Sequence, residues 1–332
     1  MQKRNKQDLL ILFFKSVLMG TANKLPGISG GLVALITGFY HEMVITFKSL
    51  NIKTIKALLR GNFKKIEKEY NGLFLVIVLL GIIVSYFTTS KILDFFFKIS
   101  ELNVWSFFFG MIIASLFILI NQNKVNNKKD IIYLCIGFSI GFILSISDPI
   151  SENQNLLFVF FCGMISICGM IIPGISGSFL LILLGNYKLL LVDSVDALIE
   201  SVWIITNMDN FNDIDFNLIR ILIVFSLGSV FGLILLSNIL SWLINNYENT
   251  VNQLIIGFVS GSLLMIWPWK KSYIEEFNNL EISNNYLRYL PDLSQTKDII
   301  ALACVISGLV IVLYVEKYVS RKKNIWTYRE KN

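Results

Sequence analysis

Two copies of one pentapeptide, Pro26-Gly27-Ile28-Ser29-Gly30 and Pro173-Gly174-Ile175-Ser176-Gly177, stand at an offset of 147 residues in this chain. Each copy is followed at the same spacing by a glycine and a tyrosine, which are Gly38 and Tyr40 in the first copy and Gly185 and Tyr187 in the second. The same offset relates Leu9 to Leu156, Phe13 to Phe160, Phe14 to Phe161, Gly81 to Gly228 and Gly110 to Gly257. A register kept over about a hundred residues indicates an internal duplication.

The composition places both copies in a membrane protein. Of the 332 residues, 55% are hydrophobic and 16% are charged, and the mean hydropathy is +0.65. Soluble domains carry roughly 25% charged residues, so this surplus of apolar side chains requires lipid as its solvent. A soluble enzyme, a secreted disulfide scaffold, a coiled coil and a disordered chain are therefore excluded.

Six apolar runs have about the length that a helix needs to cross a bilayer, which is roughly 20 residues. They are residues 73–90, 104–120, 131–147, 218–244, 251–269 and 299–316. The segments around the pentapeptides are different, because 8–40 and 156–187 are each divided at Pro-Gly into two limbs of about 15 residues, or on the order of 22 Å at 1.5 Å per residue. Such limbs favour a re-entrant helical hairpin over two full crossings.

These lengths predict an all-α polytopic membrane protein built from two inverted repeats. Repeat 1 (1–150) contains one hairpin and three crossings, and repeat 2 (151–332) contains the same set. Three crossings are an odd number, so the second repeat is inserted upside down relative to the first. With both termini in the cytoplasm, the inner segments hold nineteen Lys or Arg residues and the outer segments hold seven, as the positive-inside rule requires.

The pentapeptide ends one helix and begins another. Proline fixes φ and lacks an N–H donor, glycine permits positive φ and close approach, and serine is a favoured N-cap residue. The new half-helix presents unpaired N–H groups and the positive end of its dipole, which together suit an anion. The alternative is a kink that serves only helix packing. The predicted anion-binding residues are Asn23, Lys24, Ser29, Gly30, Gly31, Ser176, Gly177 and Ser178, and the predicted helix-break or gate residues are Pro26, Gly27, Pro173, Gly174, Tyr40 and Tyr187.

Lys24 is the most informative single residue, because it lies inside a broken hairpin and its counterpart in the second copy is Ile171. A lysine in the membrane interior is costly, and an anionic head group would offset that cost; snorkelling of Lys24 to the inner interface is the alternative. Arg220 fits an interfacial anchor or a phosphate contact. Glu42 fits a solvated hairpin end or a carrier of a coupling proton.

Other features of the sequence predict structural roles rather than parts of a functional site. The basic segment 45–70 fits a helix on the inner leaflet, and the acidic segment 193–215 belongs outside. The four cysteines lie within apolar runs and fit small hydrophobic residues. With one histidine and no nucleotide-binding or metalloprotease motif, the sequence predicts that the protein is not an enzyme and holds no metal. The net charge of +6 is explained by the inner loops, not by nucleic acid.

The paired motifs resemble those of a bacterial membrane family that includes the PopT-type undecaprenyl-phosphate translocases, and the resemblance covers essentially the whole chain. The family pattern has Gly-x-Ala, three residues and then Pro-Gly-Val-Ser-Gly-Gly-Thr, where residues 20–32 read GTANKLPGISGGL. Leu32 replaces the usual threonine, and Asn23-Lys24 replace a common acidic residue. A coupling role for that acidic position therefore does not transfer to this chain.

The resemblance implies a polyprenyl-phosphate flippase of the bacterial plasma membrane, which returns undecaprenyl phosphate from the outer to the inner leaflet for cell-envelope polymer synthesis. The phosphate would lie between two opposed half-helix N-termini, with alternating access by rocking of the repeats and coupling to an H⁺ or Na⁺ gradient. No cofactor is expected. The expected partners are the lipid substrate and membrane lipids, with a homo-oligomer left open. The alternative functions are an ion-coupled secondary transporter of a small soluble anion and a non-transporting membrane scaffold or enzyme.

Overall fold

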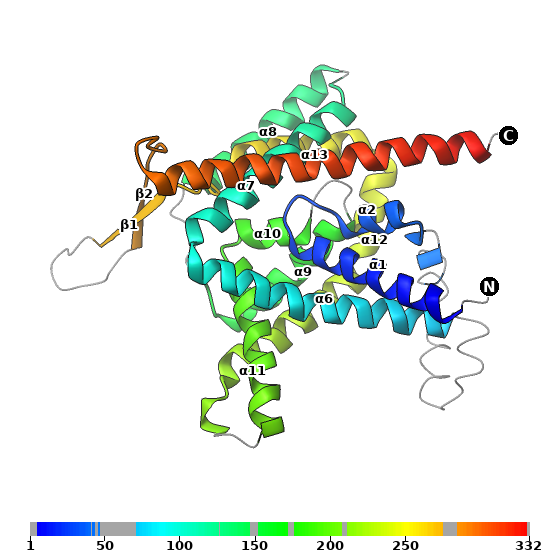
Figure 1. Cartoon of the computed structure of the whole chain (residues 1–332). Coiled ribbons are helices and arrows are strands. Elements are labelled where there is room, and N and C mark those ends of the chain that lie inside the picture. Colours follow the sequence, from blue (N-terminus) through cyan, green and yellow to red (C-terminus); the bar gives the residue numbers. More distant parts are fainter. Residues whose placement is uncertain are drawn as a thin grey trace. The chain divides into compact units, whose positions relative to one another are not determined.

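The computed structural model describes residues 5–40, 42–43, 46, 71–125, 127–146, 152–171, 176–207, 211–274 and 284–330. The chain is predominantly helical (Figure 1). Contacts divide it into two compact units: unit 1 comprises residues 1–24, 29–89 and 316–332, and unit 2 comprises residues 25–28 and 90–315. These units cut across the predicted repeats, which are defined by sequence similarity and stay a prediction.

The helices of the first half follow the hydropathy pattern. Three predicted spans lie within α6 (Gly72–Ile99), α7 (Glu101–Gln122) and α8 (Lys128–Ile146), with residue 147 of the third span outside the described residues. The first broken segment forms α1 (Lys6–Lys24) and α2 (Gly30–Thr37), with the Pro-Gly turn between them. The predicted inner-leaflet segment 45–70 lies almost wholly outside the described residues.

The second half begins with α9 (Leu156–Ile171) and α10 (Gly177–Leu183), which flank the second motif. A π-helical turn, η1 (Leu189–Asp193), leads into α11 (Ser194–Asn207), and the short 3-10 turn η2 (Phe211–Asp213) precedes the long helix α12 (Phe216–Ser262). The acidic segment 193–215 is therefore largely helical. Two of its carboxylates are engaged locally, since Asp193 pairs with Lys188 at 2.9 Å and Asp215 caps α12.

The last third of the chain adds two details to the prediction. Helix α12 consists of two helical segments joined by a kink at Tyr247 (φ −139°, ψ 34°), which lies within the predicted break 245–250 between the spans 218–244 and 251–269, and it ends at Ser262 before a turn that leads to Pro268. Proline cannot continue a helix and disfavours helical backbone in the residue before it. The predominantly helical chain also has a short hairpin that was not predicted, in which β1 (Lys270–Ile274) pairs antiparallel with β2 (Asn284–Arg288). Helix α13 (Thr296–Glu330) contains the final span.

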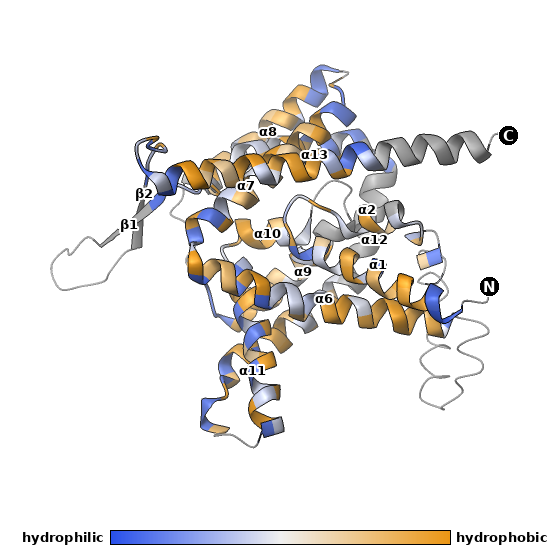
Figure 2. Ribbon diagram, viewed as in Figure 1, coloured by the Kyte–Doolittle hydropathy of each residue, from blue (hydrophilic) through white to orange (hydrophobic). Residues whose placement is uncertain are grey.

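Apolar side chains cover the outside of the long helices, as a membrane location requires. Val76, Ile83 and Phe95 of α6 are each about half exposed, and Figure 2 shows hydrophobic residues along α6, α8 and α13. Among the described residues, three helices are long and apolar enough to cross a bilayer: 72–99, 101–122 and 296–318. Helices with this surface are stable only in lipid or against another apolar surface.

In unit 1, small residues let α1 and α6 approach closely. A Cβ added to Gly81 would lie 2.5 Å from the Ser16 Cβ and 2.9 Å from the Phe13 carbonyl oxygen, and a Cβ added to Gly20 would overlap Ser85. Small residues at such crossings are typical of helix packing in membranes. The apolar core beside this crossing consists of Leu12, Met19, Ala34, Phe39, Met43, Phe74 and Val78.

Glycines play the same part in unit 2, at positions related by the sequence offset. Gly110 of α7 packs on the backbone of Val305 in α13, and its counterpart Gly257 of α12 packs on the backbone of Leu134 in α8. In the reverse direction, Gly308 of α13 packs on Phe107, while Gly137 of α8 packs on Leu254. Leu254 is the counterpart of Phe107 at the same offset of 147 residues.

Candidate functional site

The turn at Pro26-Gly27 has a backbone that only glycine accepts. Gly27 has φ +87°, in the left-handed region that disfavours residues with a Cβ. An added Cβ would also lie 2.8 Å from the Met111 carbonyl oxygen and 2.8 Å from Ser115 Oγ, both on α7. The carbonyl belongs to a packed helix and cannot move aside cheaply. Gly27 is therefore fixed by its conformation and by its surroundings.

The same glycine links the two motifs. Ser115 Oγ donates a hydrogen bond to the Gly27 carbonyl at 2.5 Å, and the Gly27 N–H donates to Ser176 Oγ at 3.2 Å. We call these two hydrogen bonds the motif contact. It joins residues 149 positions apart in the chain, and all three of its residues belong to unit 2.

Ser176 is a buried N-cap residue. Its Oγ accepts a hydrogen bond from the Phe179 N–H at 3.3 Å, which confirms the prediction that this serine begins a helix. Ser178 Oγ donates to Ser176 Oγ at 3.1 Å, and Ser178 is 1% exposed. Gly177 begins α10 and packs against the Ser166 carbonyl of α9, where a Cβ would overlap that oxygen. Ser176, Gly177 and Ser178 thus form a compact polar end of α10.

A small cavity adjoins the motif contact. Its lining combines polar groups of Gly27, Ser115 and Ser176 with apolar side chains of Ile112, Leu116, Leu119, Phe179 and Val259. The space holds about one water molecule. A phosphate group with four oxygens is larger than this cavity, so a head group could enter only if Gly27 and Ser176 moved apart.

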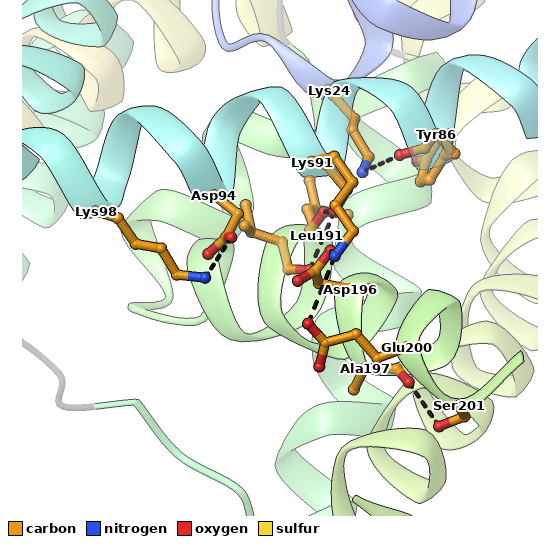
Figure 3. Close-up of polar contacts among 12 residues, drawn as sticks. Lys24, Tyr86, Lys91, Asp94, Lys98, Leu191, Asp196, Ala197, Glu200 and Ser201 are labelled. Atoms are coloured by element: carbon orange, nitrogen blue, oxygen red, sulfur yellow. Dashed lines mark hydrogen bonds and ion pairs between the residues drawn. The ribbon is translucent and has the colours of Figure 1, made fainter. Parts of the chain in front are cut away.

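Lys24 is the last residue of α1 and is fully buried. Its Nζ donates a hydrogen bond to the Tyr86 carbonyl of α6 at 2.6 Å and lies 4.7 Å from the centre of the Tyr86 ring, so the ammonium also makes a cation–π contact (Figure 3). The structure therefore places Lys24 within unit 1 rather than at an interface with water. A lysine ammonium that is buried needs such partners to offset its loss of hydration.

Asn23 lies beside the start of α2. Its Oδ1 accepts a hydrogen bond from the Gly30 N–H at 3.1 Å, so a side chain seven positions earlier satisfies the first amide of the half-helix. Ser29 and Gly31 are partly buried at the same helix end. The amide of Asn23 thus occupies part of the position predicted for an anion.

The two gate tyrosines lie in different surroundings. Tyr40 is 40% exposed, whereas Tyr187 is fully buried and makes an edge contact with Phe108 at a centroid distance of 5.3 Å. Glu42 Oε1 accepts a hydrogen bond from Asn71 Nδ2 at 2.8 Å. Arg220 is exposed and donates to Asn217 Oδ1 at 2.9 Å. Pro173 and Gly174 lie outside the described residues.

Sequence analysis missed Ser115 and Tyr86. Ser115 is a hydroxyl inside the apolar run 104–120, and a polar side chain within a span was the signal that could have identified it. Tyr86 contributes a backbone carbonyl, which no sequence pattern marks. Within the part of the chain that the structure describes, no cluster of three or more His, Cys, Asp or Glu side chains could hold a metal ion.

A group of ion pairs around the buried Asp196 lies within unit 2. Lys91 of α6 pairs with Asp196 of α11 at 2.5 Å and with Glu200 at 3.5 Å (Figure 3). The neighbouring Ser90 donates its Oγ hydrogen bond to the Leu191 carbonyl in the π-helical turn η1. These contacts fix this end of α6 to α11, and they involve none of the predicted anion-binding residues.

Comparison with known proteins gives the family. A polyprenyl-phosphate transporter of Vibrio cholerae serotype O1 is 28% identical over 322 residues, which cover 95% of this chain and 98% of that protein. A polyprenyl-phosphate transporter of Staphylococcus aureus is 25% identical over 270 residues, which cover 78% and 86%. No solved structure matches this chain. The family described as undecaprenyl phosphate translocase-like matches residues 19–282, and the chain therefore belongs to this family of membrane proteins.

Proposed function

We propose that this protein carries a polyprenyl phosphate across the bacterial plasma membrane and returns undecaprenyl phosphate from the outer to the inner leaflet for envelope-polymer synthesis. Family membership and two relatives named polyprenyl-phosphate transporter support transport of this lipid class. The phosphate is the part that needs protein, because a charged group is costly in hydrocarbon. The polyprenyl tail can stay in lipid throughout.

The observation that carries the site is the motif contact. The Gly27 N–H and the Phe179 N–H both donate to Ser176 Oγ. A phosphate oxygen accepts such hydrogen bonds more strongly than a hydroxyl does, because the bond to an ionised acceptor is charge-assisted. We therefore expect the head group to enter beside Ser176, to take over the Gly27 N–H and to accept hydrogen bonds from the hydroxyls of Ser176 and Ser178.

Lys24, Asn23 and Ser29 are the proposed contribution of the first motif. In the conformation described, the Lys24 ammonium is held by the Tyr86 carbonyl and ring. A phosphate offers that ammonium a full opposite charge instead of a dipole. Transfer of Lys24 from Tyr86 to the phosphate would then accompany binding.

Alternating access would arise from two inverted repeats that rock against each other. The glycine contacts in unit 2 support a duplicated arrangement, since Gly110 on Val305 and Gly257 on Leu134 repeat the same packing with the two halves exchanged. Each repeat would then supply a helix that packs against the other repeat. Both termini would lie in the cytoplasm, and an H⁺ or Na⁺ gradient would set the direction.

The test uses purified protein in proteoliposomes that contain a short-chain polyprenyl phosphate. Leaflet transfer of the head group is followed for wild type, Ser176→Ala and the matched control Ser201→Ala. Ser201 is also a buried serine, and among the described residues its Oγ donates to the Ala197 carbonyl within α11 alone. Loss of one charge-assisted hydrogen bond, about 1.5–3 kcal/mol, should slow transfer roughly 10- to 100-fold in Ser176→Ala.

Two outcomes would reject parts of this proposal. Equal transfer by Ser176→Ala and Ser201→Ala would remove Ser176 from the phosphate site. Transport of a soluble phosphate anion without transfer of the lipid would favour the alternative, an ion-coupled transporter of small anions. Imposed pH and Na⁺ gradients, applied separately, identify the coupling ion.

A further inference from the structure

The β-hairpin after α12 holds two cations side by side. Lys270 and Arg288 are directly paired residues at the open end of β1 and β2. Directly opposed residues of an antiparallel pair have Cβ atoms about 4.5–5.5 Å apart, and like charges in this position are destabilising. Both residues belong to unit 2 and lie in the segment that loop charges predict to be outside.

Each cation is partly engaged by a helix end. Lys270 Nζ donates to the Met265 carbonyl in the turn that follows α12. Arg288 Nη2 donates to the Ser145 carbonyl at the end of α8 at 2.6 Å, and its Nε donates to the Leu264 carbonyl at 3.1 Å. Carbonyl ends of helices attract cations, which explains why two positive charges are tolerated here.

Among the described residues, these contacts use one N–H donor of Lys270 and two of Arg288. Lysine has three such donors and arginine has five, so most of them remain available to a ligand. We call Lys270 and Arg288 the cationic cluster.

One buried carboxylate follows in the same outer segment, and its described contacts are with residues other than the two cations. Asp298, which is fully buried, accepts a hydrogen bond from the Asp292 N–H at 2.9 Å at the start of α13. It also bonds the Tyr289 side chain and raises the Tyr289 pKa after the larger effect of burial. Burial, followed by the charge of Arg288, lowers the pKa of Lys270 to about 8. The cationic cluster thus has the character of a site for an external anion.

Its surroundings favour a lipid over a soluble anion. Trp267 contacts Trp269 and Phe109 at centroid distances of 5.3 and 5.5 Å, and tryptophans of this kind lie at head-group depth in membranes. Leu290 and Leu293, a few residues after Arg288, are 79% and 69% exposed. Exposed leucines beside two cations suit an apolar chain that ends in an anionic head group.

Charge decides which anionic lipid fits. A phosphomonoester carries about −1.5 to −2 at pH 7, whereas a phosphodiester of a bulk phospholipid carries a single negative charge. We infer that the cationic cluster of Lys270 and Arg288 is a docking site for the phosphomonoester head of a polyprenyl lipid, separate from the motif contact. The transported lipid would bind here before it reaches the motif contact, and this role rests on the proposed function.

The experiment uses the full chain in vesicles with a polyprenyl phosphate that carries a photoreactive group next to the phosphate. After irradiation, labelled peptides are identified by mass spectrometry. We expect label on residues 267–270 or 288–293 of wild type, and at least a tenfold loss of that label in Lys270→Gln/Arg288→Gln. Lys297→Gln, a change of another cation in the same predicted outer segment, should keep it. The charge-preserving variant Lys270→Arg/Arg288→Lys should keep it too, which separates loss of charge from loss of fold.

The remaining measurements identify the class of ligand and test the docking site separately from the proposed function. Excess phosphatidylglycerol that removes the label would overturn the phosphomonoester assignment, and millimolar inorganic phosphate that removes it would overturn the lipid assignment. Ser176→Ala should retain the label, because docking precedes transfer. If wild type transfers the lipid but is not labelled at these peptides, the docking site is wrong and the proposed function stands. If the label forms without any transfer, the transport function is wrong and the docking site stands.

Discussion

Substitution of Gly27 by alanine tests the motif contact against a control that the chain itself provides. Gly27 and Gly38 both have strongly positive φ, at +87° and +84°. They differ in their surroundings: a Cβ on Gly27 would lie 2.8 Å from the Met111 carbonyl oxygen, and a Cβ on Gly38 would have nothing within 4 Å. The pair therefore separates backbone strain from steric overlap.

The expected magnitudes follow from these two terms. Placing a Cβ in the left-handed region costs about 1–2 kcal/mol, and this cost applies to both variants. Overpacking against a rigid neighbour adds about 1–3 kcal/mol, and only Gly27→Ala incurs it. Alanine restricts the unfolded chain to the same extent at either position, by about 0.4–1 kcal/mol, so this effect cancels. Gly27→Ala should thus be about 1–3 kcal/mol less stable than Gly38→Ala.

The assay is reversible unfolding in mixed micelles, with transfer of polyprenyl phosphate measured on the same preparations. Gly27→Ala should unfold at a lower denaturing-detergent fraction and transfer the lipid more slowly, because the overlap displaces the Gly27 N–H from Ser176. Gly38→Ala should lose only the strain energy. If the free energies of unfolding of the two variants agree within about 0.5 kcal/mol, the close packing of Gly27 against α7 is wrong.

Three further outcomes are expected. Lys24→Met should keep or increase the stability of the protein, since apolar replacement of a buried charge is often neutral or stabilising. The same variant should abolish lipid transfer. Reduced stability with normal transfer would show that Lys24 has a structural role instead. Burial and, secondly, the charge of Arg288 lower the pKa of Lys270 from its usual 10.5 to about 8. Between these two pH values the unfolded chain binds more protons than the folded chain, so the free energy of unfolding should rise with pH there. Lys270→Met should flatten that rise in unfolding measured from pH 7 to 10. Gly257→Ala should cost about 1–3 kcal/mol in mixed-micelle unfolding by overlap with the Leu134 backbone; unchanged stability would contradict the close helix contact.

Much of the helical architecture was predictable because hydropathy and helix-breaking residues act locally. The broken segment around Pro26 is divided into α1 and α2 as predicted, and Ser176 begins α10 as an N-cap. The hairpin of β1 and β2 was not predicted, since a ten-residue pairing in a polar segment has no helix-length signal. The predicted break at residues 245–250 coincides with the kink at Tyr247, but its sharpness was not predictable, because a kinked helix and two separate helices have the same apolar pattern.

Composition and register can be counted without knowledge of contacts, so they establish that the chain is a membrane protein with a duplicated Pro-Gly-Ile-Ser-Gly motif. They also identify Lys24 as a charge in an apolar setting. The contacts of these residues come from the folded arrangement: Gly27 contacts Ser115 and Ser176, and Lys24 contacts the Tyr86 carbonyl. Such partners are distant in sequence and include backbone atoms common to every residue, so no local pattern specifies them. These contacts arise from the packing of helices against one another at their glycine-containing faces.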